Sequence, residues 1–286
     1  MSEAEHAWIV ELENDRSLFE PDRLRQRIDA LDRIERHAVL GSPRSGADAA
    51  LRNRIESLRA GLEAANERLY RSIRQAIRRG AGADALAAWS PAADPHAQSA
   101  SGTESYDHLD ALLGGVLRLD EPAAETAALE PEMVFYQPTP ARHIFGLIDR
   151  TGLAEGDVLI DLGSGLGHVP LLAAIRTGAR CVGIEREAAF VDCARRGADA
   201  LGLRNAEFVA QDARAADLSA GTVFYLYTPF TGALLGEVLD RLRREATSRP
   251  IRVCTLGPCT AAVAREPWLE GIGAEATNGL AFFRSV

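Results

Sequence analysis

The sequence predicts an α/β protein in which helices pack on both faces of a mostly parallel β-sheet, with a helical region before the sheet. Over residues 131–286, short apolar runs alternate with segments of helical periodicity, which is the order that builds parallel sheets. Over residues 1–125, apolar residues recur at helical spacing. The chain has 286 residues, enough for two modest domains. We therefore expect a helical domain at residues 1–125 and an α/β domain at residues 126–286.

The first expected strand and the loop after it form the most informative stretch, V-L-I-D-L-G-S-G-L-G-H-V at residues 158–169. Residues 158–162 predict a buried parallel strand, and a helix begins near Val169. The three glycines between them allow a sharp turn, which places backbone N–H groups and the positive end of a helix dipole beside a small ligand. They are Gly163, Gly165 and Gly167.

The spacing of these glycines restricts the ligand. The pattern is D-x-G-x-G-x-G, whereas a dinucleotide loop has G-x-G-x-x-G, and here His168 stands at the sixth position. A phosphate-binding loop needs a lysine, and the chain contains none. Considered alone, the loop is also compatible with a simple turn between a strand and a helix.

Two further expected strands are each followed by a carboxylate. Residues 180–184 predict the second strand, and Glu185 stands at its end, 22 residues after Gly163 (185 − 163). A carboxylate about 20 residues past the loop can accept hydrogen bonds from both hydroxyls of a ribose. Residues 206–210 predict the third strand, which Asp212 follows. Carboxylates are common at strand ends, but the three features occur in order and at the spacing of strand–helix–strand units.

This order of features resembles the class I methyltransferases that depend on S-adenosylmethionine (SAM). The resemblance implies a Rossmann-like sheet of seven strands with one antiparallel edge, methyl transfer as the activity and SAM as the cofactor. In that family the glycine loop packs against the methionine part of SAM, and an acidic residue after strand 3, with the next N–H, holds the adenine. The implied cofactor-binding residues are Asp161, Gly163, Ser164, Gly165, Gly167, Glu185, Asp212 and Ala213.

Residues 131–257 are similar to a narrower branch, the non-SET histone and protein-lysine methyltransferases, through D-L-G-S-G-L-G-H-V and an upstream Tyr-x-Pro-Thr. That similarity implies N-methylation of a protein amine of the lysine type. The turn at residues 228–230 departs from the branch and is similar to the N-P-P-Y loop of amine methyltransferases. There are two alternatives. The acceptor is a small molecule or RNA, or the protein is a non-catalytic SAM-binding module assembled through the N-terminal helices.

Methyl transfer needs an aligned nucleophile, a dry site and a deprotonated amine. An aromatic mouth with backbone carbonyls can provide these conditions, and it can also hold a methylated ammonium by cation–π contact. The expected catalytic residues are Tyr136, Tyr227, Thr228 and Phe230. The three aromatic residues are alternatively core residues. His168 is either a base or, as we expect, a helix cap, and Thr139 is expected to cap a helix that starts with Pro140.

The N-terminal region contains a long amphipathic helix over about residues 48–79. Its apolar stripe runs from Leu51 to Ile77, and its other faces carry many arginines. These arginines suit RNA or an acidic partner, but a solvated face is the more ordinary explanation. The stripe predicts either a helical hairpin with residues 21–40 or a homodimer seam.

Composition excludes several classes of protein. The net charge is −9, so the composition gives no indication of nucleic-acid binding. No apolar run reaches the ~20 residues of a membrane span, and the acidic N-terminus lacks the features of a signal peptide, so we expect a cytoplasmic protein. Four cysteines without a C-x-x-C pair predict free thiols and no metal site. Arginine-only basic residues suggest a GC-rich coding sequence and a bacterial protein.

Overall fold

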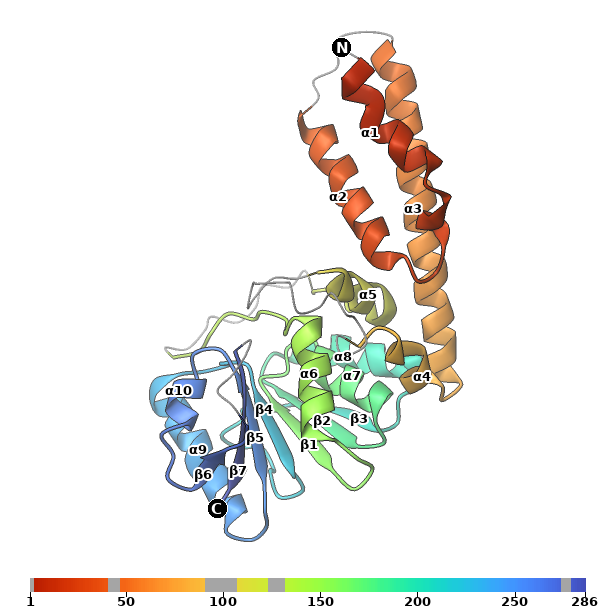
Figure 1. The fold of residues 1–286 in the computed structure, drawn as a ribbon. Helices are drawn as coiled ribbons and strands as arrows, with labels where there is room; N and C mark the ends of the chain where they lie inside the picture. The colour runs from red at the N-terminus through yellow and green to blue at the C-terminus, as the bar shows by residue number, and fades with distance from the viewer. Residues whose placement is uncertain (1–2, 41–46, 91–106, 123–131, 274–278) are drawn as a thin grey trace. The chain divides into compact units, whose positions relative to one another are not determined.

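The computed structural model describes residues 3–40, 47–90, 107–122, 132–273 and 279–286 (Figure 1). The helices are α1 (Glu3–Asn14), η1 (Arg16–Phe19), α2 (Leu24–Leu40), α3 (Ala47–Arg78), α4 (Gly82–Ala87), α5 (His108–Leu117), α6 (Ala141–Thr151), α7 (His168–Arg176), α8 (Ala188–Leu201), α9 (Gly232–Ala246) and α10 (Thr260–Val263). The strands are β1 (Val158–Leu162), β2 (Arg180–Glu185), β3 (Ala206–Ala210), β4 (Val223–Leu226), β5 (Arg252–Leu256), β6 (Leu269–Gly271) and β7 (Leu280–Ser285).

The seven strands form a single sheet in the order β3-β2-β1-β4-β5-β7-β6. Strands β1 to β5 pair in parallel, and β7 runs antiparallel to both of its neighbours, β5 and β6. The predicted seven-strand Rossmann-like fold with an N-terminal helical region is therefore confirmed. The sequence predicts two final short strands, at about residues 272–276 and 279–285. The first of them lies earlier than predicted, because β6 ends at Gly271, and residues 274–276 lie outside the described residues.

Helices cover both faces of the sheet because successive strand residues point to opposite sides. Figure 1 shows α6, α7 and α8 side by side on one face. On the other face, strand residues such as Ile160, Ile184 and Phe224 share a buried apolar cluster with α9, to which that helix contributes Leu235 and Leu239. This packing fixes the carboxyl ends of β1 to β4, and ligands bind at those ends in open α/β sheets.

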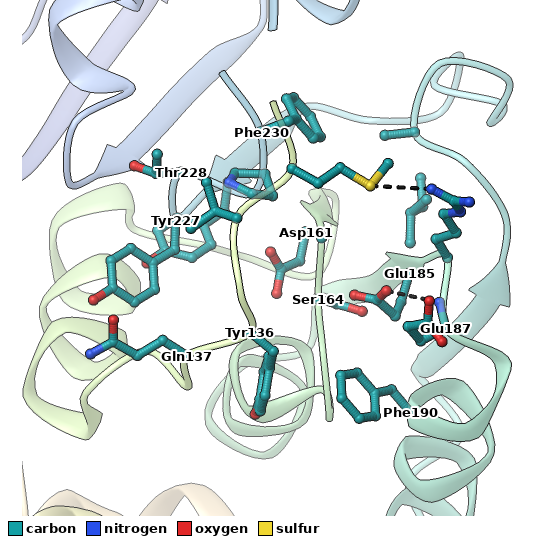
Figure 2. Close-up of a pocket in the computed structure, with 18 of the residues that line it drawn as sticks. Tyr136, Gln137, Asp161, Ser164, Glu185, Glu187, Phe190, Tyr227, Thr228 and Phe230 are labelled. Atoms are coloured by element: carbon teal, nitrogen blue, oxygen red, sulfur yellow. Dashed lines mark hydrogen bonds between the residues drawn. The ribbon is translucent and has the colours of Figure 1, made fainter. Parts of the chain in front are cut away.

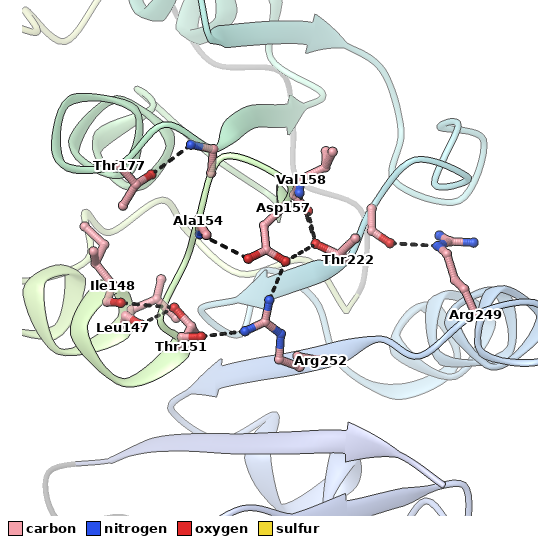
Figure 3. A network of polar contacts seen from close by, with 12 residues as sticks. Leu147, Ile148, Thr151, Ala154, Asp157, Val158, Thr177, Thr222, Arg249 and Arg252 are labelled. Atoms are coloured by element: carbon pink, nitrogen blue, oxygen red, sulfur yellow. Dashed lines mark hydrogen bonds and ion pairs between the residues drawn. The ribbon is translucent and has the colours of Figure 1, made fainter. Parts of the chain in front are cut away.

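Hydrogen bonds and an ion pair connect the amino ends of β1, β4 and β5, at the edge of the sheet away from the cavity-forming carboxyl ends (Figure 3). Asp157 accepts hydrogen bonds from the Thr222 hydroxyl at 2.8 Å and from the Ala154 N–H at 3.1 Å, and it forms an ion pair with Arg252. Arg252 also donates to the carbonyl of Thr151, at the end of α6. Because one carboxylate joins three chain segments, we expect it to contribute strongly to the stability of the sheet.

The contacts within the chain divide it into two compact units. Residues Met1–Gln75 and Asp107–Val116 form the first unit, and Ala76–Tyr106 and Leu117–Val286 form the second. In the first, residues of α1, η1, α2 and α3 share a core that includes Ile9, Ile34 and Leu62. Part of the apolar stripe of α3 is thus buried by helices of the same chain, as a hairpin requires. A homodimer through these helices stays a prediction.

A buried arginine organises the first unit, and the sequence pattern did not single it out. Arg27 is 0% exposed, and it donates to Asn66 Oδ1 at 2.6 Å and to the carbonyls of Leu18, Glu20 and Pro21. Burial lowers the pKa of its guanidinium. The hydrogen bonds explain how the charge is tolerated, since they satisfy carbonyls that the break between α1 and α2 leaves without helical partners.

The second unit begins before the boundary expected at residue 126. Gly82 of α4 lies so close to α7 that a Cβ there would stand 2.7 Å from Ile175, and Arg176 donates to the carbonyl of Leu86. Cys193 of α8 donates to the carbonyl of Asp120 at 3.2 Å. Residues on both sides of α5 therefore pack on the α/β domain.

This packing predicts the outcome of shortening the chain. A chain that starts at residue 126 should aggregate, because it exposes the surfaces of α7 and α8 that α4 and residues 117–122 cover. A chain that starts at residue 76 keeps those covering residues and should be the more stable of the two. Gel filtration and urea unfolding of the two shortened chains test this expectation, and equal stability of both would contradict it.

Candidate active site

A cavity of about 530 Å³ opens at the carboxyl ends of β1, β2, β3 and β4 (Figure 2). Its wall includes residues of the glycine loop, of the two following strand ends and of the turn after β4. A segment that precedes α6 closes another side; we call residues 132–139 the strap. The lining residues include Glu121, Phe135, Tyr136, Asp161, Gly163, Ser164, His168, Glu185, Arg186, Glu187, Phe190, Asp212, Ala213, Arg214, Tyr225, Tyr227, Thr228 and Phe230.

The glycine loop is held against the end of β2 by its own backbone. The N–H groups of Gly163 and Ser164 both donate to the carbonyl of Ile184, at 2.8 and 3.0 Å. Gly163 has a φ of +86°, in the left-handed region that glycine adopts without strain. Gly163 and Ser164 line the cavity, as expected for residues beside a ligand.

The other two glycines of the loop make room for protein side chains. Gly165 and Gly167 are absent from the cavity wall, although the sequence predicts them as cofactor-binding residues. A Cβ on Gly165 would stand 2.0 Å from the ring of Tyr136, and one on Gly167 would stand 2.5 Å from the ring of Phe208. Direct contact of these two glycines with the cofactor stays a prediction, and the structure shows that packing requires them.

Glu185 faces the cavity with both carboxylate oxygens oriented by backbone donors. Its Oε2 accepts from the N–H of Gly165 and its Oε1 from the N–H of Glu187, each at 2.9 Å. A carboxylate oxygen can accept two hydrogen bonds, so each oxygen keeps capacity for one ligand hydroxyl. The geometry fits the vicinal hydroxyls of a ribose.

Two polar groups near Glu185 have no hydrogen-bond partner in the described part of the chain. The carboxyl of Asp161 is 4% exposed and has no hydrogen-bond partner among the described residues. Burial, with a smaller effect from the charge of Glu185, raises the pKa of Asp161 well above its ordinary value. The Ser164 hydroxyl is also buried, and no described residue forms a hydrogen bond with it. Unpaired buried groups are costly, so both fit a site that a polar ligand completes.

Asp212 and Ala213 follow β3, where the sequence places the adenine. Asp212 is paired with Arg214, whose Nη2 lies 2.6 Å from Oδ2 and whose Nε lies 3.0 Å from Oδ1. These hydrogen bonds lower the pKa of Asp212. An adenine amino group would therefore share this carboxylate with Arg214, a residue that the sequence analysis did not identify.

The strap and the turn after β4, which carry the predicted catalytic residues, contact each other. Met133 and Phe230 form an antiparallel bridge, and the Val134 N–H donates to the carbonyl of Pro229 at 3.2 Å. At the start of the strap, the carbonyl of Glu132 accepts from the Thr231 N–H at 2.8 Å. The two segments thus share backbone hydrogen bonds along one side of the cavity.

Within this arrangement the predicted catalytic aromatics have different neighbours. Tyr136 packs on the glycine loop, with its ring 5.0 Å from that of Phe190, whereas Figure 2 shows Tyr227 on a different side of Asp161, near Thr228. Phe230 is 7% exposed and belongs to the apolar cluster of α9. Tyr136 therefore belongs to the cofactor side of the cavity, and Tyr227 is the more exposed aromatic of the turn.

Thr228 has a strained backbone, which its own side chain holds in place. Its φ is +40°, unusual for a β-branched residue. Its hydroxyl donates to the carbonyl of Leu256 at 2.9 Å and accepts from the N–H of Cys259 at 3.1 Å. The hydroxyl thus has a structural role, and strain of this kind often occurs at functional sites.

Two expected helix caps are wrong. Helix α6 begins at Ala141 with Pro140 as its N-cap, and the Thr139 hydroxyl instead lies 3.2 Å from the hydroxyl of the buried Tyr225. Helix α7 begins at His168 itself, with Gly167 as N-cap and no side-chain cap, while Nδ1 of His168 lies 3.3 Å from the Tyr136 hydroxyl. In both cases the side chain forms a hydrogen bond with a residue distant in sequence and does not cap the helix.

Glu121, Phe190 and Tyr225 also line the cavity, and sequence reasoning missed them. Phe190 and Tyr225 look like ordinary core residues of a helix and a strand, so no local signal distinguishes them. Glu121 comes from the region expected to be outside the site. In the described part of the chain, no cluster of His, Cys, Asp or Glu can hold a metal ion, and no helix has the length and apolar character to cross a membrane.

Comparison with known proteins finds methyltransferases. Residues 153–226 match the family model of a methyltransferase domain, and no curated protein matches the chain significantly. An RNA methyltransferase from Salinibacter ruber, solved with S-adenosyl-L-homocysteine (SAH), is 28% identical, with 52% of this chain and 92% of that chain covered and a TM-score of 0.40. A putative methyltransferase from Escherichia coli is 19% identical, with 54% and 90% covered and a TM-score of 0.42.

The family match, the strand order and the glycine loop with Glu185 define a class I methyltransferase domain. The protein is a SAM-dependent methyltransferase, and SAM is its cofactor. The cavity fits that cofactor through the oriented carboxylate of Glu185, the unpartnered Asp161 and Ser164 and the cavity volume.

Replacing Glu185 with alanine should weaken SAH binding by about 1–3 kcal/mol, because two ribose hydroxyls lose a charged acceptor. Isothermal titration calorimetry measures this change. Glu207→Gln is the matched control, since Glu207 is an exposed carboxylate of β3 that pairs with Arg180. An unchanged affinity for Glu185→Ala, or binding of NAD as tight as that of SAH, would remove Glu185 and the ribose assignment from the site.

Proposed function

We propose that this protein transfers the methyl group of SAM to a nitrogen, and that the acceptor is a protein amine of the lysine type. The sulfonium of bound SAM supplies an activated methyl group. The chain's residues then need to align the amine, exclude water and leave its lone pair free.

The observation that carries this proposal is the backbone of Thr228. Thr228 lines the cavity and is 7% exposed, and its carbonyl has no hydrogen-bond partner among the described residues. The hydroxyl bonds to Leu256 and Cys259 hold the turn in its strained conformation. A fixed, unpaired carbonyl is suited to accept an N–H of an amine, and it orients the nitrogen without taking up its lone pair.

The charges of the cavity favour a cationic amine over a polyanion. The wall contains four carboxylates, those of Glu121, Glu185, Glu187 and Asp212, besides Asp161, whose pKa is raised, and two guanidinium groups, those of Arg186 and Arg214. The whole chain carries a net charge of −9. Such a field attracts lysine and repels the phosphates of RNA.

Aromatic rings complete the acceptor side. Tyr227 lines the cavity, and Phe135 of the strap is 83% exposed at its edge, where it can contact a bound peptide. A ring beside the amine excludes water and stabilises a methylated ammonium. We assign Tyr227 and the Thr228 carbonyl to the acceptor, and Phe230 to the packing that supports them.

The proposal is tested with labelled SAM and host lysate, separated into protein, RNA and small molecules after the reaction. We expect the label in protein, on a lysine nitrogen after hydrolysis. Label in RNA or in small molecules would assign the corresponding alternative acceptor. SAH binding without any transfer would support the non-catalytic binding module.

Replacing Thr228 with valine should lower kcat by about 10- to 100-fold, because the turn loses both hydrogen bonds that fix its carbonyl. SAH affinity should stay within a few-fold of wild type, since this residue is assigned to the acceptor. Thr247→Val is the control, because Thr247 is the C-cap of α9 and its hydroxyl donates to the carbonyl of Arg244 in the same helix. Wild-type turnover by Thr228→Val would contradict the assignment.

A further inference from the structure

A hydrogen bond joins the first residue of α7 to the strap. The Tyr136 hydroxyl lies 3.3 Å from Nδ1 of His168. Burial lowers the pKa of His168 to about 4, so the imidazole is neutral at pH 7. A neutral ring that carries its hydrogen on Nε2 has a free lone pair on Nδ1, which accepts a hydrogen bond from the Tyr136 hydroxyl.

The ring of Tyr136 occupies the space beside Gly165 that a side chain would otherwise take. A Cβ on Gly165 would stand 2.0 Å from Cε2 of Tyr136 and 2.4 Å from its Cδ2. The ring also contacts Phe190, at 5.0 Å between centroids and 55° between planes. His168, Gly165 and Phe190 therefore surround the ring.

Gly165 connects this ring to the ribose carboxylate. The N–H of Gly165 donates to Oε2 of Glu185 at 2.9 Å. If the ring moves, the loop at Gly165 gains freedom, and the orientation of Glu185 is lost with it. The chain of contacts runs from His168 through Tyr136 and Gly165 to Glu185.

We propose that His168 is a positioning residue for the cofactor: its hydrogen bond to Tyr136 holds that ring against Gly165 and thereby keeps Glu185 oriented for SAM. The competing explanation gives His168 only a local role at the start of α7. This proposal rests on the cofactor pocket and is independent of the acceptor proposed above, so SAH binding in the absence of acceptor tests it separately.

Calorimetry of SAH binding to variants of the full chain tests the proposal. The substitution His168→Asn places an amide where Nδ1 of the histidine lies, whereas His168→Gln places an amide where Nε2 lies. His168→Ala, His168→Gln and Tyr136→Phe should each weaken SAH binding about three- to ten-fold, the effect of one neutral hydrogen bond. His168→Asn should stay within about two-fold of wild type.

A double-mutant cycle separates positioning from a local role. The variant with both His168→Ala and Tyr136→Phe should bind SAH no more weakly than the weaker single variant, because both changes remove the same hydrogen bond. Three results would overturn the proposal. They are losses of SAH affinity that multiply in the double variant, an affinity of His168→Asn as low as that of His168→Ala, and an unchanged affinity of Tyr136→Phe. If His168→Ala fails to fold, Tyr136→Phe and the comparison of Asn with Gln still decide.

Nitrogen NMR of ¹⁵N-histidine-labelled protein provides a second measurement, with the His168 signals assigned by comparison with His168→Asn. We expect the tautomer with hydrogen on Nε2 at pH 7, and a change in the Nδ1 shift in Tyr136→Phe. A hydrogen on Nδ1, or a shift insensitive to Tyr136→Phe, would contradict the hydrogen bond on which the proposal depends.

Discussion

Replacing Gly165 with alanine should weaken SAH binding by at least about 100-fold, equivalent to about 2.7 kcal/mol. Two effects combine in this variant. Gly165 has a φ of +52°, where an alanine costs roughly 1–2 kcal/mol. The new Cβ would also stand 2.0 Å from Cε2 of Tyr136, so either the ring or the loop has to move.

The ring of Tyr136 cannot move without loss, because His168 and Phe190 contact it on other sides. A movement of the loop instead displaces the N–H that orients Glu185. Gly236→Ala is the control, since Gly236 lies within α9 and a Cβ there meets no atom within 4 Å. It should leave SAH affinity unchanged, and wild-type affinity of Gly165→Ala would show that the packing of Tyr136 is unimportant.

Replacing Asp157 with alanine should lower the free energy of unfolding of the sheet by about 2–4 kcal/mol. The change leaves the guanidinium of Arg252 without its carboxylate and removes the acceptor of the Thr222 hydroxyl and the Ala154 N–H (Figure 3). Urea unfolding followed by the fluorescence of Trp268, in a Trp8→Phe, Trp89→Phe background, measures the effect. The exposed Asp240→Asn should change stability little.

The contribution of Asp157 should also depend on pH. Burial raises the pKa of this carboxyl, but the hydrogen bonds from Thr222 and Arg252 outweigh that effect, so the pKa lies below its ordinary value. The stabilisation is therefore fully present above the unfolded-state pKa of about 4 and is lost as the pH falls through the folded-state value. The stability difference between wild type and Asp157→Asn should shrink over that range. A constant difference would contradict the ion pair.

The sequence was sufficient for the sheet because each central strand is a short apolar run that a turn or a carboxylate ends. Strands β1 and β3 have the predicted bounds, 158–162 and 206–210. The small edge strand β6 was misplaced, since three residues contain too little periodicity to define a strand.

The candidate site was predictable where a single residue type carries the chemistry, and less so where distant side chains meet. Glu185 could be identified from its distance to the glycine loop. The pairing of Tyr136 with His168 joins residues 32 positions apart, and it depends on the path of the strap. The need for Gly165 was foreseen, but its reason is the ring of Tyr136.

The strap has a consequence for how the two substrates influence each other. It covers the glycine loop with Tyr136, and its Val134 N–H bonds to the carbonyl of Pro229 beside Thr228. We expect a displacement of the strap on the cofactor side to reach the turn after β4, which we propose holds the acceptor. Such a connection makes the two binding equilibria thermodynamically linked, so a bound cofactor changes acceptor affinity by the same factor as a bound acceptor changes cofactor affinity.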